Sequence, residues 1–341
     1  MTDIEHDQVE RPFLDQLASM GWKLTTGNRV DPTPSGRSSF RDVLLEQELR
    51  ACLRRINPGP DGAPWLDDAR LSQAVAALQR IAAPELLEAN QLATALLLEG
   101  IDVEGLPHWD GGRAQRIRFI DFDDPSANLF RAVSQLRVDV PGGQARKFIV
   151  PDIVLFVNGI PLVVVECKSP NLSAPMEEAI DQLQRYSNAR TWVEEAEGNP
   201  ALFHTNALLV ATSGDDARAG TIGAGAIHYK QWKDTSPVPT ATVATELGVE
   251  QLSRQHQLVA GMLRPAHLLD IVRSFSLFMT ANGQTIKVVA RYQQFRAVQL
   301  AAQRLATGKT RLQDGEHDRR GGIVWHTQGS GKSLTMVFLV R

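Results

Sequence analysis

The chain has 341 residues, of which 43% are hydrophobic and 22% are charged, and its net charge is −3. This length predicts two domains, or one domain with part of a second. The charge excludes a general attraction for nucleic acid, so any basic contact surface must be local. An acidic N-terminus without a secretory signal, two widely separated cysteines and the lack of an apolar run of ~20 residues predict a cytoplasmic protein without a membrane partner.

The first 100 residues are predicted to be mainly helical. Phe13, Leu17 and Met20 recur at helical spacing before Gly21, which predicts a first short helix. Three further helices are expected downstream: residues 40–56, 67–83 and 84–98.

From about residue 115 the pattern changes to short apolar runs rich in β-branched residues. Two of these runs, 153–157 and 162–165, are apolar on both faces, which predicts strands in the centre of a covered sheet. The order of helices and strands predicts a layered α/β domain. The predicted strands of this domain are residues 116–122, 129–140, 153–157, 162–165 and 207–212.

Residues 234–250 are rich in proline, serine, threonine and alanine, which predicts a linker. The predicted boundaries are residues 1–235 for the first domain, 236–262 for the connecting segment and 263–341 for the start of a second domain. The remaining predicted elements are helices at 251–263, 265–280 and 292–305, a polar stretch at 307–320 and a strand at 323–325.

A β-hairpin is predicted around the dipeptide Asn158-Gly159, which separates two apolar runs. Asn-Gly is the strongest two-residue hairpin signal, because both positions of this turn need positive φ. Regular pairing would place Asp152 one residue short of Glu166. A single bulge near Pro161 would place Asp152 directly opposite Glu166.

This hairpin would bring Asp152, Glu166 and Lys168 together at its open end. Glu166 and Lys168 are two residues apart, so both point to the same face of the strand. Carboxylate oxygens suit Mg²⁺, which would polarise a phosphate and activate a water molecule. Lys168 would orient that water or stabilise developing negative charge. Taken singly, each residue is more simply interpreted as an exposed charge at a strand end.

The segment that begins at Pro151 resembles the PD-(D/E)XK nuclease superfamily, through Pro151-Asp152 and Glu166-Cys167-Lys168. Its flanking residues are similar, more specifically, to the R subunits of type I restriction enzymes, in which an apolar residue usually stands at the position of Cys167. The resemblance implies an α/β fold with a mixed central sheet flanked by helices. It also implies that Asp152, Glu166 and Lys168 are catalytic and that both carboxylates bind Mg²⁺.

Two further positions gain a role from the same resemblance. Gln182 and Tyr186 share one helix face, and spacing alone favours an ordinary surface glutamine and a half-buried tyrosine. Type I nuclease domains carry a Gln-x-x-x-Tyr motif after the lysine, which implies that these residues position the active site or the DNA backbone. Related nucleases often place a glutamate on an early helix near the metal. Glu10 is the candidate here, although a solvated helix face is the favoured interpretation.

A phosphate-binding loop is predicted between the strand at 323–325 and an apolar helix at 334–340. Its glycines let backbone N–H groups surround phosphates, Lys332 would reach the β- and γ-phosphates, and Ser333 would bind Mg²⁺. His326 replaces the first glycine of the Walker A pattern. The expected nucleotide-binding residues are Thr327, Gln328, Gly329, Ser330, Gly331, Lys332 and Ser333.

This loop resembles the form that type I R subunits and other superfamily 2 motors use. The resemblance implies the beginning of a RecA-like domain and ATP as a second cofactor. The segment 291–297 resembles their Q-motif, in which a glutamine reads the adenine edge. Gln294 is the first choice and Gln293 the alternative, whereas the segment alone would be interpreted as a polar helix face. The later motifs of such motors are not in this sequence, so we expect it to belong to a longer subunit.

The function implied is that of the restriction subunit of a type I restriction–modification enzyme. Such a subunit would assemble with methylation and specificity subunits, cleave double-stranded DNA with Mg²⁺ and translocate DNA with ATP. One alternative is a stand-alone or repair-type nuclease–helicase, or a type III restriction subunit, although the motor usually comes first in type III. Another is a non-catalytic DNA-binding assembly module, against which the intact Asp152, Glu166 and Lys168 argue.

Overall fold

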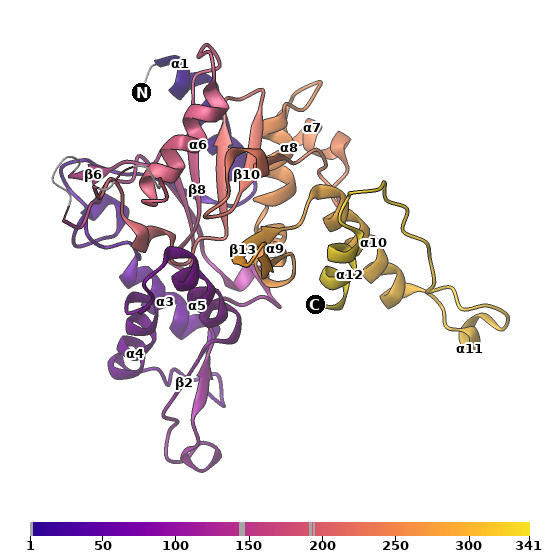
Figure 1. Ribbon diagram of the computed structural model, residues 1–341. Coiled ribbons are helices and arrows are strands. Elements are labelled where there is room, and N and C mark those ends of the chain that lie inside the picture. The colour runs from indigo at the N-terminus through magenta and orange to yellow at the C-terminus, as the bar shows by residue number, and fades with distance from the viewer. Residues whose placement is uncertain (1–2, 143–146, 191–192, 194) are drawn as a thin grey trace.

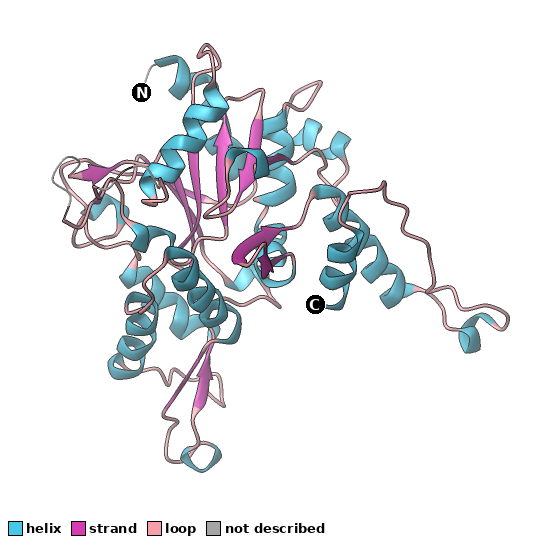
Figure 2. Ribbon diagram, viewed as in Figure 1, coloured by secondary structure: helices cyan, strands magenta, loops and turns pink. Residues whose placement is uncertain are grey.

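A computed structural model describes residues 3–142, 147–190, 193 and 195–341. Within these residues, seven strands pair into one mixed sheet in the order β1-β4-β7-β8-β9-β10-β11, and helices lie on both of its faces (Figures 1 and 2). The predicted α/β architecture with a mixed central sheet is therefore confirmed. The strands are β1 (Lys23–Thr26), β4 (Phe130–Ser134), β7 (Ile153–Val157), β8 (Ile160–Cys167), β9 (Leu208–Thr212), β10 (Ala217–Gly220) and β11 (Lys230–Gln231).

The strands of this sheet run in both directions. β1 is parallel to β4 and β8 is parallel to β9, whereas the other neighbouring pairs are antiparallel. The hairpin of β7 and β8 lies in the middle, so its backbone groups are paired on both sides. In the described part of the chain, three short two-stranded sheets accompany the main sheet: β2 (Ile101–Val103) with β3 (Gln115–Ile117), β5 (Val138–Asp139) with β6 (Phe148–Ile149), and β12 (Ser276–Ala281) with β13 (Gln284–Val289).

The hairpin forms as predicted. Asn158 and Gly159 have φ of 52° and 80°, the left-handed conformation that the tight turn requires. The register shifts between Leu155 and Phe156, because Phe156 pairs with Pro161 while Leu155 pairs with Val163. The expected bulge is therefore present and includes Leu162, the residue after Pro161.

Both faces of the sheet are buried, because alternate residues of a strand point to opposite sides. On β7, Val154 and Phe156 belong to the core that α6 (Pro175–Tyr186) covers. Ile153, Leu155 and Val157 belong to the opposite core, which α2 (Arg11–Ser19) and other helices cover. Each such side chain contributes about 1.5–3 kcal/mol when it is fully buried.

The helices of the first 100 residues follow the prediction with one correction. The helix expected at 40–56 begins only at Glu46, because the Asp42 carboxylate instead accepts hydrogen bonds from the backbone N–H groups of Ser38 and Ser39 and closes a turn. The helices described in this region are α1 (Asp3–Glu5), a short π-helix (His6–Glu10), α2, a 3-10 helix (Thr33–Ser35), α3 (Glu46–Ile56), α4 (Asp68–Gln79) and α5 (Leu86–Glu99).

Two predicted strands are shorter than expected. The run at 116–122 forms a strand only at its beginning, in β3, and Asp121 then accepts two backbone hydrogen bonds within a turn. The run at 129–140 is interrupted at Gln135, whose φ of 54° turns the chain out of β4. The segment resumes as β5, so the single predicted strand is in fact two.

The connecting segment 236–262 contains two helices. α8 (Arg254–Met262) forms where a helix was expected, at 251–263, whereas α7 (Thr240–Leu247) lies in the stretch 234–250 that was expected to be a linker. α8 lies against α2 and β10. The side chain of Gln255 accepts a hydrogen bond from Thr212 Oγ1 at 2.7 Å and donates to the Val9 carbonyl at 3.1 Å. The linker prediction is therefore wrong at α7, whereas α8 is the expected helix and is held to the body of the molecule by these hydrogen bonds.

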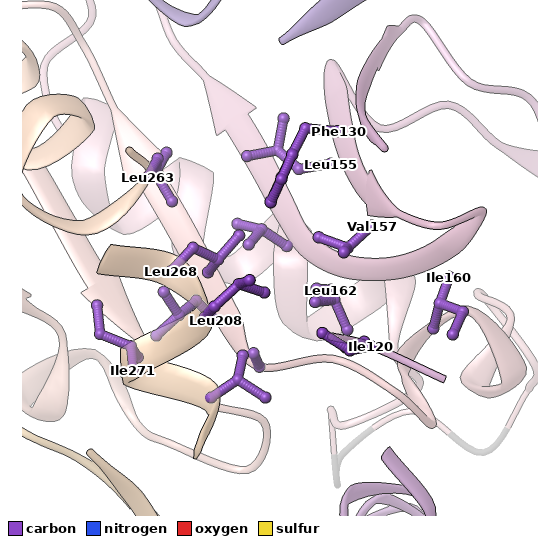
Figure 3. Close-up of a cluster of buried hydrophobic side chains, with 14 of the residues drawn as sticks. Ile120, Phe130, Leu155, Val157, Ile160, Leu162, Leu208, Leu263, Leu268 and Ile271 are labelled. Carbon is purple, nitrogen blue, oxygen red and sulfur yellow. The ribbon is translucent and has the colours of Figure 1, made fainter. Parts of the chain in front are cut away.

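The hydrophobic core continues across the predicted boundary at residue 263. α9 (Pro265–Ser274) ends before the predicted limit of residue 280, since Ser276–Ala281 forms β12 and pairs with β13 through the turn Asn282-Gly283. Figure 3 shows apolar side chains from both sides of the boundary in one cluster: Phe130, Leu155, Val157, Leu162 and Leu208 with Leu263, Leu268 and Ile271.

The remaining chain lies beside this body. α10 (Tyr292–Thr307) and α12 (Lys332–Val340) lie next to each other, and the chain between them extends outward with α11 (Arg311–Asp314) near its tip (Figure 1). The strand predicted at 323–325 is not formed. Its apolar residues have no neighbouring strand, and Ile323 and Trp325 are 92% and 89% exposed. In the part of the chain that the structure describes, no helix is both long and apolar enough to cross a membrane.

Candidate active site

Asp152 and Glu166 are brought to adjacent positions by the register of the hairpin. Ile153 pairs with Val165, so the residues that follow in the ladder are Asp152 and Glu166. The backbone N–H of Cys167 donates to Asp152 Oδ2 at 2.8 Å, which fixes the aspartate against β8. Both carboxylates are buried, with Asp152 6% and Glu166 0% exposed.

Lys168 lies on Glu166, as their spacing predicts. Its ammonium donates to Glu166 Oε1 at 2.5 Å and to the Cys167 carbonyl at 3.2 Å. The second carboxylate oxygen, Glu166 Oε2, is buried without a hydrogen-bond partner among the described residues. A buried carboxylate oxygen of this kind is costly unless something else binds it.

Burial disfavours the charged form of both carboxylates unless a cation compensates it. It raises the pKa of Asp152, and together with the charge of Asp152 it raises the pKa of Glu166 well above its ordinary value. Burial would lower the pKa of Lys168, but the Glu166 carboxylate outweighs it, so the pKa of the ammonium is raised. The site therefore contains more buried negative charge than one lysine compensates, which favours a cation.

Glu10 completes the group of acids. It is 1% exposed at the end of the π-helix His6–Glu10, so the favoured interpretation of a solvated helix face is wrong. The amide Nε2 of Gln135 donates to Glu10 Oε2 at 3.3 Å and to Asp152 Oδ1 at 3.1 Å, and so joins the two acids. Burial, followed by the charge of Asp152, raises the pKa of Glu10 to about 7. Glu10, Asp152, Glu166 and Lys168 are called the carboxylate cluster below.

Gln182 and Tyr186 lie beside this cluster on α6. Gln182 Nε2 donates to Tyr186 Oη at 2.5 Å, and Tyr186 Oη donates to the carbonyl of Val150 at 3.1 Å. Val150 lies two residues before Asp152, so the tyrosine holds the chain that leads into the cluster. Tyr186 is buried, and burial raises its pKa, so it remains a neutral donor.

The cluster suits a hard divalent cation. Among the described residues, no three His, Cys, Asp or Glu side chains are grouped closely enough to form a metal site by themselves. Mg²⁺ needs fewer protein ligands, since it keeps several waters and commonly binds one or two carboxylates together with substrate phosphate oxygens. The free oxygens Glu166 Oε2 and Glu10 Oε1, both buried without a described partner, provide this kind of ligand next to Asp152.

The glycine-rich loop at residues 326–333 has the shape of an anion site. The Ser330 hydroxyl donates to the Thr327 carbonyl at 2.7 Å and closes the loop. No side chain of the described residues caps the N-terminus of α12, which leaves its first N–H groups for a ligand. The ammonium of Lys332 donates to the carbonyls of His326 and Thr327, at 3.1 and 3.4 Å, and Ser333 is exposed on the first helical turn.

Gln294 contacts this loop but has no free amide group. Its Nε2 donates to the carbonyls of Ser330 and Gly331, and its Oε1 accepts from the Arg291 N–H at 2.8 Å. A Cβ on Gly331, whose φ is 80°, would lie 2.6 Å from that amide nitrogen, so the contact needs glycine. Gln293 Oε1, in contrast, has no described partner.

An open cavity of about 410 Å³ borders the start of α10, the helix that carries Gln294. Its volume is within the range of small-molecule sites. Four of its side chains are cationic, which favours an anionic ligand. The lining residues are Arg218 of β10, Ala226, Ile227 and Tyr229 before β11, Lys230 and Gln231 of β11, Lys233 after it, and Arg291, Tyr292 and Gln293 at the start of α10.

Sequence reasoning missed Gln135. Nothing local marks this residue, because its partners are more than 100 positions away in one direction and 17 in the other. The only available signal is its place at the end of an apolar strand, directly before the chain returns to Asp152.

The amino-acid sequence matches one family of DNA-restriction proteins. Residues 3–226 match the family model described as type I restriction enzyme R protein N terminus. Because this match includes well over half of the chain, the protein belongs to the family of type I restriction enzyme R proteins. Residues 293–341 match a second model, described as SWI2/SNF2 ATPase.

Curated relatives agree with this assignment. The chain is 31% identical over 339 residues to the type I restriction enzyme HindI endonuclease subunit of Haemophilus influenzae, covering 98% of this chain and 30% of that protein. It is 24% identical over 345 residues to the putative MjaIXP endonuclease subunit of Methanocaldococcus jannaschii, covering 98% of this chain and 31% of that protein. The chain thus spans about a third of the length of these relatives.

Proposed function

We propose that this protein is the restriction subunit of a type I restriction–modification enzyme and cleaves double-stranded DNA with Mg²⁺ at the carboxylate cluster. The observation that carries the proposal is the bulged hairpin, which sets Asp152 beside Glu166 and leaves Glu166 Oε2 buried and unpartnered. Membership of the R-protein family supports it. The fold around the hairpin would be that of the PD-(D/E)XK nucleases.

In this proposal Asp152 and Glu166 hold the metal ion, with Glu10 close enough to Asp152 to contribute. Bound Mg²⁺ supplies a polarised scissile phosphate and a water molecule of lowered pKa. Lys168, already held by Glu166 at 2.5 Å, donates its N–H groups to the attacking water or to the developing charge on phosphate. Tyr186 and Gln182 keep the approach to Asp152 in place.

The glycine-rich loop would bind ATP and would form the beginning of a RecA-like motor domain. The N-terminus of α12 and Lys332 would bind phosphates, and Ser333 would bind the accompanying Mg²⁺. Because the amide of Gln294 is used within the protein, Gln293 is the better candidate for the adenine contact. The match to the SWI2/SNF2 ATPase model supports this part of the proposal.

The test is plasmid nicking and linearisation by the full-length protein assembled with methylation and specificity subunits. Reactions with and without ATP and Mg²⁺ are compared for the parent, Asp152→Asn, Lys332→Ala and a control, Asp121→Asn, which alters a buried aspartate outside the cluster. We expect cleavage that needs both cofactors, is lost in the first two variants and is kept in the control. Cleavage without ATP would indicate a stand-alone nuclease, and no cleavage in any form would indicate an assembly module.

A further inference from the structure

The backbone conformation of Gln135 is unusual for a glutamine. Its φ of 54° lies in the left-handed region, where glycine or asparagine is the usual choice. Glutamine gains nothing from this conformation, so its presence there needs another reason, and a strained backbone position often accompanies a functional site.

The backbone of Gln135 is held from two sides. Its N–H donates to the carbonyl of Asp152 at 2.7 Å, and Gly27, just beyond β1, donates to the Ser134 carbonyl at 2.7 Å. A Cβ on Gly27 would lie 2.5 Å from the Gln135 carbonyl oxygen, so the two chains approach as closely as glycine allows. The end of β4 is therefore fixed directly against Asp152.

Both polar groups of the Gln135 side-chain amide form hydrogen bonds beside the carboxylate cluster. Nε2 has two hydrogens, and it donates to Glu10 Oε2 at 3.3 Å and to Asp152 Oδ1 at 3.1 Å. Oε1 accepts from the guanidinium Nη2 of Arg29 at 3.3 Å. The opposite orientation of the amide would place its oxygen against two carboxylates and its NH₂ group against a guanidinium. The charges around it therefore fix the direction of the amide.

These contacts give each acid a defined orientation. Asp152 Oδ1 is held by Gln135 and Oδ2 by the Cys167 N–H, so each oxygen retains a lone pair for another ligand. Glu10 Oε2 is held by the same amide, whereas Glu10 Oε1 has no described partner. In the described part of the chain, no other side chain donates hydrogen bonds to both Glu10 and Asp152.

We propose that Gln135 is the positioning residue of the carboxylate cluster, whose amide orients Glu10 and Asp152 so that their remaining oxygens face one divalent cation. This inference rests on the metal-dependent function proposed above. Hydrogen-bond partners of metal ligands typically change metal affinity by about 10–100-fold when they are removed. Gln135 orients the ligands and is not itself expected to touch the scissile phosphate.

The test uses two variants that separate this role from a structural one. Gln135→Leu keeps the size of the side chain and removes the amide, while Gln135→Gly removes the amide and suits the left-handed backbone. The control is Gln184→Leu, which removes a half-buried glutamine of α6 that donates only to the Ala224 carbonyl. In the full-length protein without nucleotide, Mg²⁺ affinity is measured by calorimetry and stability by thermal unfolding.

We expect both Gln135 variants to bind Mg²⁺ about 10–100-fold more weakly than the parent, with the control unchanged. The Gly variant should keep or raise the unfolding temperature, so its weak binding could not be attributed to poor folding. Unchanged Mg²⁺ affinity in the Gly variant would overturn the proposal. Mg²⁺ affinities that fall only in variants with a lowered unfolding temperature would overturn it too.

Cleavage in the assembled enzyme separates this proposal from the proposed function. With a cleaving parent, we expect both Gln135 variants to cleave at least tenfold more slowly at the Mg²⁺ concentration that half-saturates the parent, and to recover as Mg²⁺ is raised. Variants that cleave like the parent would overturn the role of Gln135 and leave the proposed function standing. A parent that neither binds Mg²⁺ nor cleaves would overturn both.

Discussion

The carboxylate cluster and the glycine-rich loop are built in different ways. Asp152 and Glu166 lie at the open end of one hairpin, whereas Glu10 comes from a helix far away in the sequence, and the sheet with its covering helices places them together. The loop at residues 326–333 takes its shape from neighbours, through the Thr327–Ser330 turn and the first turn of α12. A long-range topology therefore positions the first site, and local backbone geometry positions the second.

The two sites also differ in how deeply the residues around them are buried. Phe156, in the middle of the sheet, is 0% exposed, whereas Trp325, just before the loop, is 89% exposed. Between residues 308 and 341 the buried residues are Ser330, Thr335 and Phe338. The cluster thus depends on a packed core, while the loop can keep its form with little core around it.

The largest effect is expected for Lys168→Ala, because this ammonium is the single cation paired with Glu166 in the described structure. Cleavage by the assembled enzyme should fall by about 10²–10³-fold or more, the usual result of removing a donor to a developing anion. Plasmid cleavage rates measure the change, with Lys309→Ala, an exposed lysine outside the cluster, as the control. Circular dichroism should show that the fold persists. Retained cleavage would remove the cluster from the nuclease mechanism.

The second prediction compares the replacement of an aromatic residue by alanine in the central sheet and just before the glycine-rich loop. Phe156→Ala should lower the free energy of unfolding by about 3–5 kcal/mol, because it leaves a cavity in a close-packed core. Trp325→Ala should change it by less than about 0.5 kcal/mol, because the indole is almost fully exposed. Denaturant unfolding of the two variants measures both values. Equal losses would show that residues 323–325 are packed as firmly as the sheet.

The third prediction concerns Lys287, which joins β13 to the body of the molecule. Its side-chain nitrogen is buried and donates to Asn90 Oδ1 at 2.8 Å and to the Asn206 carbonyl at 2.7 Å. Burial lowers the pKa of this lysine from 10.5 to about 7. Between these two pH values the unfolded chain binds a proton that the folded chain does not, so stability rises with pH and the contribution is lost as pH falls towards 7.

Lys287→Met should remove that pH dependence. Relative to the variant, the parent should gain about 1.4 kcal/mol of unfolding free energy per pH unit in this window. Thermal unfolding of both proteins over the window measures the difference. Parallel pH profiles would show that the lysine keeps its proton in the folded state.

Local signals in the sequence predicted the hairpin well. Asn158-Gly159 fixed the turn, and the requirement that Asp152 meet Glu166 placed a bulge next to Pro161, where the structure has it. The same dipeptide at Asn282-Gly283 went unused, and a helix was predicted over β12 instead. The apolar residues there allow either structure, and the turn decides between them.

Other features depended on contacts that no local pattern contains. The run 323–325 has strand-forming residues, but a strand also needs a neighbour to pair with, and none lies beside it in the described chain. Glu10 was named from resemblance, and a solvated helix face was the favoured interpretation, yet folding buries it beside Asp152. Gln135 acquires its role only when residues 10, 29 and 152 converge.

The most direct test of the central claim is whether the carboxylate cluster binds a divalent cation. Mg²⁺ is titrated calorimetrically into the full-length protein without nucleotide, beside Glu166→Gln and the control Glu48→Gln, which alters a largely buried glutamate paired with Arg131. The account predicts saturable binding to the parent and to the control, and affinity at least about tenfold weaker in Glu166→Gln. Equal binding by all three proteins, or no binding by any, would contradict it.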